Sequence, residues 1–117
     1  MEHMTPQQVA TWVAETAGTA PAPLLLDVRE PWEFETASIA GAARVPMSTI
    51  TGRIAELESL RETADGAIRP IVCICHHGAR SMQVAGFLAA RGATDVHNLT
   101  GGVAAWAHQV DAAFPTY

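Results

Sequence analysis

The 117-residue sequence predicts a single α/β domain, residues 1–117, in which helices flank a central, mostly parallel sheet in three layers. Short apolar runs of strand length alternate along the chain with segments whose apolar residues recur at helical spacing. This alternation favours parallel strands joined by crossover helices. The length suits one domain, and the hydrophobic content of 49% is enough for a substantial core.

The first third of the chain predicts a helix, a strand and a second, short helix. Thr5, followed by Pro6 and then Gln8, is typical of a capping box at a helix start. Residues 24–28, LLLDV, form the kind of short apolar run found in strands covered on both faces. Residues 31–36 begin with a proline and are expected to form the short helix.

The middle of the chain predicts a weak strand and a further helix. Residues 43–45 form the strand, which the following proline ends. Ile50, Ile54 and Leu57 share one side of a helix when they are placed at helical spacing. Ser48 is expected to cap that helix.

The second half contains the strongest strand, residues 71–74, IVCI. A helix is expected after the loop that begins at Cys75, and Gly92 is a suitable C-terminal cap for it. Residues 95–99 predict another strand, and a Gly-Gly turn at 101–102 leads into a last helix. We expect the three tryptophans to anchor the core, and two lone histidines to be structural or solvated. These residues are Trp12, Trp32, Trp106, His97 and His108.

Composition excludes several classes of function. The net charge of −5 argues against a nucleic-acid partner, which needs basic patches. All basic residues apart from histidine are arginines, so Schiff-base chemistry through a lysine is excluded. The N-terminus has neither the basic stretch nor the apolar run of a signal peptide, and no segment is long enough to span a membrane. We therefore expect a cytoplasmic protein with no membrane partner.

The two cysteines are expected to be free thiols. Cys73 and Cys75 lie two apart in a predicted strand, which separates their α carbons by about 6.6 Å. That separation is near the upper limit for a disulfide, and free thiols fit a reducing compartment. Cys73, Cys75, His76 and His77 crowd into five residues with no second cluster, so we expect no metal and no other cofactor.

Cys75 is the candidate nucleophile, because it stands where an apolar strand ends and a helix is about to start. Four residues separate it from Arg80. A loop of that length lets several backbone N–H groups converge on one sulfur, with the positive end of the following helix behind it. A thiol in such a nest ionises more readily than an ordinary cysteine. Cys73 lies inside the apolar strand and is expected to pack in the core; a resolving or sulfur-relay thiol is the alternative.

Four segments in this order resemble the signatures of the single-domain rhodaneses, a family of sulfurtransferases. Residues 26–34, LDVREPWEF, resemble the first signature, and residues 39–42, IAGA, followed by Val-Pro, resemble the second. Residues 75–81, CHHGARS, resemble the active-site loop, and residues 98–106, NLTGGVAAW, resemble the C-terminal signature. Ser38 and Ala40 depart from the family pattern, which often has histidine and proline there. The resemblance implies a rhodanese-like fold.

The resemblance also implies a mechanism and a set of site residues. Cys75 would take a sulfane sulfur from thiosulfate or a persulfide donor and pass it from a Cys75 persulfide to a thiol or cyanide acceptor. A protein acceptor is a further possibility. Substrate binding is expected from the loop residues His76, His77, Gly78, Ala79 and Arg80. Support for the loop is expected from Asp27, Arg29 and Ser81.

Three alternatives remain open at the level of sequence. Cysteine phosphatases and related arsenate reductases also hold a thiolate in a loop that ends with arginine. Their loop has five residues between the cysteine and the arginine, whereas four residues lie between Cys75 and Arg80. The shorter loop encloses less space and suits a single sulfur better than a phosphate. A sulfur carrier or interaction module for a specific protein partner is the third alternative. Arg80 itself either binds substrate or pairs with a carboxylate and holds the loop, and the sequence favours neither role.

Overall fold

The sheet at the centre of the molecule is parallel throughout. In the computed structural model, which describes residues 1–19 and 21–117, it contains five strands. They are β1 (Glu2–Met4), β2 (Leu24–Asp27), β3 (Ala43–Arg44), β4 (Ile71–Ile74) and β5 (Val96–Leu99). Their spatial order is β1-β5-β4-β2-β3, and each neighbouring pair runs parallel. The predicted α/β class with a parallel sheet is confirmed.

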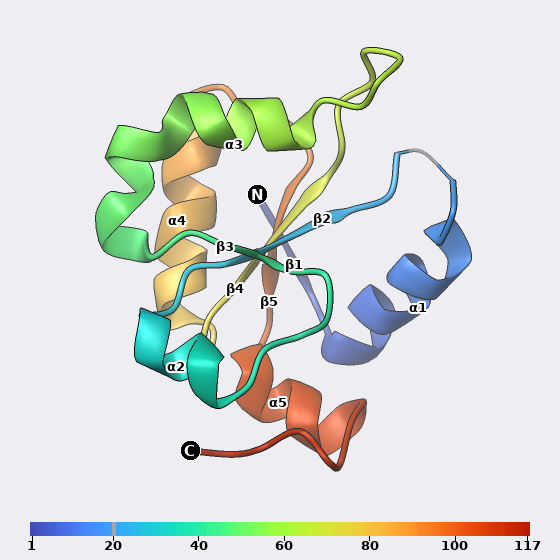
Figure 1. Cartoon of the computed structure of the whole chain (residues 1–117), viewed down its shortest axis with the longest axis vertical. Helices are drawn as coiled ribbons and strands as arrows, with labels where there is room; N and C mark the ends of the chain where they lie inside the picture. Colours follow the sequence, from blue (N-terminus) through green and yellow to red (C-terminus); the bar gives the residue numbers. More distant parts are fainter. Residues whose placement is uncertain (20) are drawn as a thin grey trace.

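Helices cover both faces of this sheet (Figure 1). One face carries α1 (Pro6–Thr16) and α5 (Gly102–Gln109), which pack against each other. The other face carries the 3-10 helix η1 (Met47–Arg53), α3 (Ile54–Arg61) and α4 (Ala79–Ala90). The short helix α2 (Pro31–Thr36) lies near the end at which the strands finish.

The central strands are buried on both sides, and this explains their nearly continuous apolar sequences. In β4, Ile71 and Cys73 face the core on the α3–α4 side of the sheet. Val72 and Ile74 face the core on the α1–α5 side. All four side chains are at most 1% exposed. Strand β4 therefore carries the segment that follows it to the middle of the sheet edge.

Two details of the fold differ from the sequence prediction. Ser48 does not cap a helix: the chain enters η1 with Pro46 at the N-cap and no side-chain cap, because the proline already starts the turn. Ser48 therefore lies inside the 3-10 segment that precedes α3. Strand β1 was not predicted, since it is a three-residue edge strand without an apolar pattern.

The expectation that every tryptophan anchors the core is wrong for Trp32, whose side chain is 59% exposed. Helix α2 has only six residues, and it buries Glu33 and Phe34 instead. Trp106 is buried, and Trp12 is half-buried with its ring edge-on to His97, 5.2 Å between centroids.

The carboxyl ends of the strands meet α2, the start of α4 and the start of α5 (Figure 1). In a parallel α/β sheet, this is the edge at which functional sites form. Among the described residues, no helix is both long and apolar enough to cross a membrane.

Candidate active site

Cys75 directly follows β4, and its side chain is almost fully buried, at 1% exposure. Its Sγ atom accepts a hydrogen bond from the backbone N–H of Gly78 at 3.0 Å and lies 3.2 Å from Ser81 Oγ. Gly78 is the N-cap of α4 and has a φ of 105°, a backbone conformation that residues other than glycine rarely adopt. The sulfur thus lies at the N-terminal, positive end of a twelve-residue helix.

Helix α5 holds the loop from the opposite side. The backbone N–H of Val103 donates to the carbonyl of Cys75 at 2.9 Å, and that of Ala104 donates to the carbonyl of His76 at 3.0 Å. In a trans peptide the N–H and C=O groups point in opposite directions. Fixing these two carbonyls towards α5 therefore directs the amides of His76 and His77 away from α5.

Gly102 allows α5 to approach the loop this closely. Its φ is 60°, and a Cβ atom there would overlap the carbonyl oxygens of Cys75 and His76. Gly78 meets the same turn from the loop side, since a Cβ on it would lie 3.1 Å from the backbone nitrogen of Gly101. The loop and the Gly-Gly turn are thus fitted backbone against backbone.

A buried polar chain leads away from the sulfur through Ser81. The Ser81 hydroxyl lies 2.5 Å from Asn98 Oδ1 and 3.3 Å from the carbonyl of Gly78. Asn98 is 3% exposed, and its amide nitrogen lies 3.3 Å from Nδ1 of His3. Ser81 has one proton to donate, so the chain sets whether that proton faces Asn98 or the sulfur.

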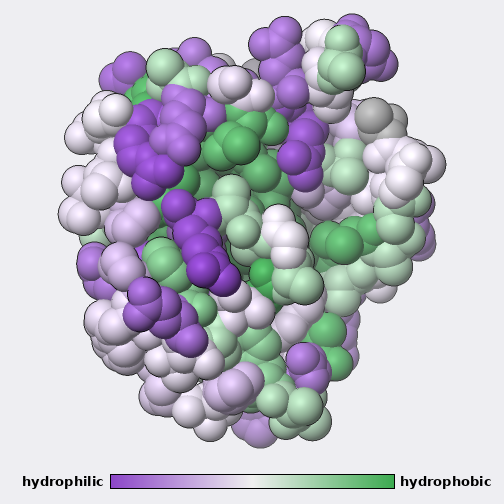
Figure 2. All heavy atoms as spheres, viewed as in Figure 1, coloured by the Kyte–Doolittle hydropathy of each residue, from purple (hydrophilic) through white to green (hydrophobic). Residues whose placement is uncertain are grey.

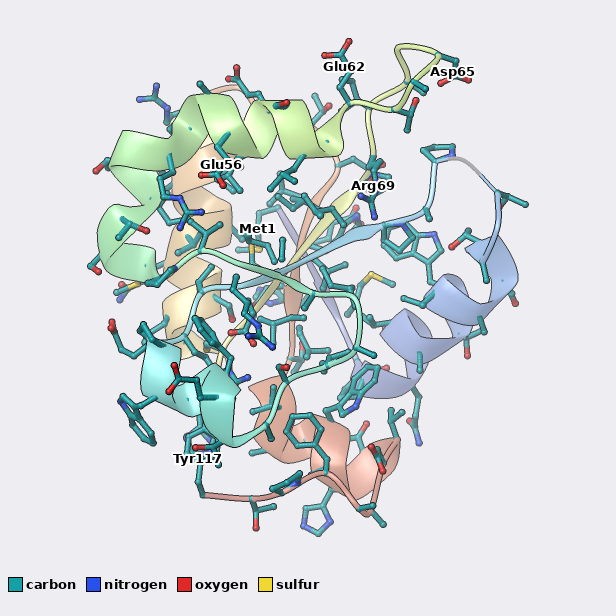
Figure 3. The ribbon with its side chains drawn as sticks, in the orientation of Figure 1. Met1, Glu56, Glu62, Asp65, Arg69 and Tyr117 are labelled. Atoms are coloured by element: carbon teal, nitrogen blue, oxygen red, sulfur yellow. The ribbon has the colours of Figure 1, made fainter. Side chains whose placement is uncertain are left out.

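Arg80 turns away from the sulfur and pairs with Glu33 of α2. Its Nη1 and Nη2 atoms donate to Oε1 and Oε2 of Glu33 at 2.5 and 2.8 Å. The guanidinium lowers the pKa of the Glu33 carboxyl to about 2, and Glu33 raises the pKa of Arg80. The Tyr117 hydroxyl also donates to Glu33, at 2.8 Å, and Tyr117 is labelled beside α2 in Figure 3.

Asp27 and Arg29 form a buried ion pair behind α2, with 2.7 Å between Nη2 and Oδ2. Arg29 also donates to the carbonyl of Ala37 at 2.6 Å and to the Tyr117 hydroxyl at 2.7 Å. Neither Asp27 nor Arg29 hydrogen-bonds directly to the Cys75 loop within the part of the chain that the structure describes. Their link to the loop runs through Tyr117 and Glu33.

The remaining loop side chains form its outer surface. His76 is half-buried between two rings: it stacks on Tyr117 with centroids 4.1 Å apart and on His77 with centroids 3.9 Å apart. Burial, followed by the charge of His77, lowers the pKa of His76. His77 and Ala79 are exposed.

Cys73 is separate from this arrangement. It is fully buried on the α3–α4 side of the sheet, and burial raises the pKa of its thiol to about 12. Both cysteines are free thiols. His97 is buried beside Asp95, with 2.8 Å between Nε2 and Oδ1, and His108 is exposed.

Sequence reasoning gave no role to several residues that shape this site. Glu33, Asn98 and Gly102 lie within the quoted signatures, but only their tertiary contacts single them out. The capping box at the start of α2 was a usable signal for Glu33, because it fixes that side chain near the helix start. Tyr117 has no local signal.

Comparison with known proteins places this geometry in a family. The sequence profile of the Rhodanese-like domain matches residues 9–109. The chain is 37% identical over 84 residues to a protein named sulfurtransferase from Allochromatium vinosum, covering 72% of this chain and 71% of that protein. It is 36% identical over 95 residues to the adenylyltransferase and sulfurtransferase MOCS3-1 of Zea mays. That match covers 80% of this chain but only 20% of the maize protein, about a fifth of its length.

Among solved structures, a rhodanese-related protein from Thermoplasma volcanium superposes with a TM-score of 0.76 and 25% sequence identity, over 94% of both chains. The fold, the family profile and the sulfurtransferase relatives agree with one another. The chain therefore belongs to the rhodanese-like domain family.

Proposed function

We propose that the protein is a sulfurtransferase that carries a sulfane sulfur on Cys75. The observation that carries the proposal is the position of Cys75 Sγ, 3.0 Å from the Gly78 amide and 3.2 Å from the Ser81 hydroxyl at the start of α4. The Gly78 amide, the helix end and, when its one proton faces the sulfur, the Ser81 hydroxyl favour a negative charge on the sulfur without a metal or an adjacent base. The names of the relatives support sulfur transfer as the class of reaction.

The first half-reaction is a nucleophilic displacement. The Cys75 thiolate attacks the outer sulfur of thiosulfate and forms a new S–S bond. The old S–S bond of thiosulfate breaks, and sulfite leaves with its electron pair. The product is a Cys75 persulfide anion, whose terminal sulfur bears the charge. A persulfide donor reacts in the same way and releases its thiolate.

The second half-reaction returns the enzyme to its starting state. Cyanide or a thiolate attacks the outer sulfur of the persulfide, the S–S bond breaks, and Cys75 leaves as a thiolate. Thiocyanate is the product with cyanide, and a new persulfide is the product with a thiol. Because sulfite leaves before the acceptor binds, the kinetics are ping-pong.

The sulfur donor is expected to bind to the backbone amides of the loop more than to the side chain of Arg80. Both terminal nitrogens of Arg80 are engaged by Glu33, so this guanidinium acts as a brace for the loop. The amides from His76 to Arg80 and the positive end of α4 remain to attract an anionic donor. His76, His77 and Ala79 form the outer surface of the loop and would affect the access of a donor to the sulfur.

A protein-borne thiol is a second class of acceptor. Trp32 is 59% exposed and lies 5.6 Å from the Tyr117 ring, which in turn stacks on His76. These three rings form a contiguous aromatic surface beside the loop. Exposed aromatic side chains of this kind are enriched where proteins dock.

The test is a paired assay with intact mass measurement. Incubation with thiosulfate is expected to add one sulfur atom to Cys75, and cyanide is expected to remove it as thiocyanate. Cys75→Ser should abolish both steps, whereas Cys73→Ser should retain them. Full thiocyanate production by Cys75→Ser would exclude the proposal. Comparable hydrolysis of an aryl phosphate by the wild-type protein would favour the phosphatase alternative instead.

A further inference from the structure

A cavity lies at the opposite end of the sheet from Cys75. It has a volume of about 310 Å³ and lies between α3, the C-terminal end of α4 and the loop of residues 62–70. Ile71, at the start of β4, lines it. Three residues of extended chain lie between Ile71 and Cys75, and the four steps from one to the other span about 13 Å. The cavity is therefore distinct from the proposed sulfur-transfer site.

The walls of this cavity are largely apolar. Its lining includes Ile54, Leu57, Ile68, Ile71 and Leu88. In Figure 2, hydrophobic side chains show in the gap between the hydrophilic residues of α3 and those of the loop at the upper right. Small-molecule sites are typically apolar pockets of roughly 300–1,000 Å³ with a few polar groups that fix orientation. The volume is at the lower end of that range and suits a small ligand.

Three charged residues line the cavity, namely Glu58, Arg61 and Arg91, and Arg61 is the buried one among them. It lines the cavity and is only 8% exposed. Its Nε donates to the carbonyl of Arg69 at 2.9 Å, and its Nη2 donates to the carbonyl of Thr94 at 2.7 Å. A guanidinium has five N–H donors, and Nη1, which is not fully buried, makes no hydrogen bond to any residue that the structure describes. Burial lowers the pKa of Arg61.

Arg61 forms no ion pair within residues 1–19 and 21–117, although the nearby charge of Asp95 offsets part of the effect of burial on its pKa. The other largely buried arginine, Arg29, pairs with Asp27, and the loop arginine Arg80 pairs with Glu33. A buried charge is costly unless an opposite charge compensates it. Two backbone carbonyls compensate Arg61 only in part, so an anion in the cavity would complete its coordination.

We propose that this cavity binds a small monocarboxylate with a short apolar chain. The carboxylate would accept hydrogen bonds from Arg61, and the chain would lie against the apolar walls. One buried guanidinium matches one negative charge. Glu58 also lines the cavity and disfavours a dianion such as phosphate, whereas Arg91 adds a second positive charge to the lining. This inference does not depend on the proposed sulfur transfer.

The first test is a titration of the full ¹⁵N-labelled chain with hexanoate at millimolar concentrations, followed by amide chemical shifts. We expect saturable shifts confined to the cavity lining, such as Leu57, Ile68 and Ala93. Acetate lacks the chain and 1-hexanol lacks the charge, so each should bind at least about 10-fold more weakly. Equal binding of hexanol, or no saturable shift with hexanoate, would overturn the proposal.

Matched variants test whether Arg61 supplies the positive charge that binds the carboxylate. Arg61→Met should weaken hexanoate binding about 10- to 100-fold. The thermal unfolding of this variant is measured as well, because it also loses the hydrogen bonds to the carbonyls of Arg69 and Thr94. Ile68 lines the cavity but is 54% exposed, so it can be changed without cost to the core. Ile68→Glu should weaken binding about 10-fold through repulsion, and Ile68→Gln much less. Equal effects of the Glu and Gln variants would contradict the assignment.

Discussion

Glu33 binds Arg80 with both carboxylate oxygens, at 2.5 and 2.8 Å, and thereby joins α2 to the start of α4. The contact orients the arginine that follows the Cys75 loop and takes up its terminal nitrogens. Glu33 is 2% exposed, whereas the Arg80 side chain is 32% exposed, so the pair lies at the boundary between core and solvent. The loop is thus fixed from α2 on one side and from α5 on the other.

Replacing Glu33 by glutamine should destabilise the protein in a pH-dependent way. Gln at this position can keep the capping bond to the Glu30 amide, but it removes the charge and replaces the oxygen that accepts from Arg80 Nη2 and Tyr117 by an NH2 group. The pKa of Glu33 is lowered from 4.5 to about 2, so its ionised form stabilises the folded state above about pH 4.5, and this contribution is lost as the pH falls towards 2. We expect Glu33→Gln to cost about 1–2 kcal/mol at pH 7, a value limited by the exposure of Arg80.

Urea unfolding of both proteins between pH 7 and pH 2 measures this difference. The gap in free energy of unfolding between wild type and Glu33→Gln should shrink towards zero at the acid end. Glu35→Gln is the control, because Glu35 lies on the same helix and is exposed. A gap that does not change with pH would mean that the charge of Glu33 is not what stabilises the loop.

Ser81→Ala should slow the reaction of Cys75 with iodoacetamide. The variant removes the hydroxyl 3.2 Å from Sγ, whose one proton must turn from Asn98 Oδ1 to the sulfur when Cys75 ionises. A hydrogen bond to a charged group contributes about 1.5–3 kcal/mol, and the bond to Asn98 that is given up offsets part of this. At pH 6 the alkylation rate should therefore fall about 10-fold. The variant also leaves Asn98 Oδ1 without its 2.5 Å partner, so thermal unfolding should show a loss of stability. Ser59→Ala, an exposed serine on α3, is the matched control.

Gly102→Ala should impair sulfur transfer more than its effect on stability alone explains. The added Cβ would overlap the carbonyls of Cys75 and His76, and the φ of 60° is strained for alanine. The loop must shift, which misplaces its amides around the sulfur. Thiocyanate production should drop at least about 10-fold, equivalent to about 1.4 kcal/mol in the barrier.

Gly86→Ala provides the control for this substitution. Gly86 lies inside α4, and a Cβ there would have no neighbour within 4 Å. Alanine should stabilise the helix by up to about 1 kcal/mol and leave activity unchanged. If Gly102→Ala and Gly86→Ala behaved alike, the close approach of α5 would have no part in the site.

Cys73 should be inert in the native protein. Its pKa is raised to about 12, so it is almost entirely protonated at pH 8, and it is fully buried. Iodoacetamide at pH 8 should modify Cys75 alone, and Cys73→Ala should keep its activity at a cost of about 0.5–3 kcal/mol in stability. Peptide mapping of the alkylated protein measures this directly. Fast labelling of Cys73 in the folded state would instead favour a relay thiol.

The parallel fold was predictable because its strands are buried on both faces and their apolar runs are visible in the sequence. The run of residues 71–74 also located Cys75 at a strand end. Strand β1 escaped prediction because pairing with β5 forms it, at an edge without apolar alternation. The burial of Trp32 was wrongly predicted for a related reason. The apolar character of a side chain does not indicate which face of a six-residue helix packs against the rest of the protein.

The contacts of the site were less predictable than its position. The Arg80–Glu33 pair joins residues 47 apart in sequence, and the Tyr117–Glu33 hydrogen bond joins residues 84 apart. Such pairings depend on how α2 and the chain end pack against the loop. The sequence therefore left both roles of Arg80 open, and the structure gives the guanidinium a carboxylate partner.

The two amides of α5 that donate to the loop, those of Val103 and Ala104, are expected to respond to changes at the Cys75 sulfur. The peptide groups that accept from Val103 and Ala104 are the same groups whose N–H sides face away from α5. A change of charge on the sulfur polarises these peptides, and this changes the strength of the hydrogen bonds that their carbonyls accept from α5. The amide resonances of Val103 and Ala104 should therefore report the chemical state of Cys75 from a helix that begins 27 residues later in the chain.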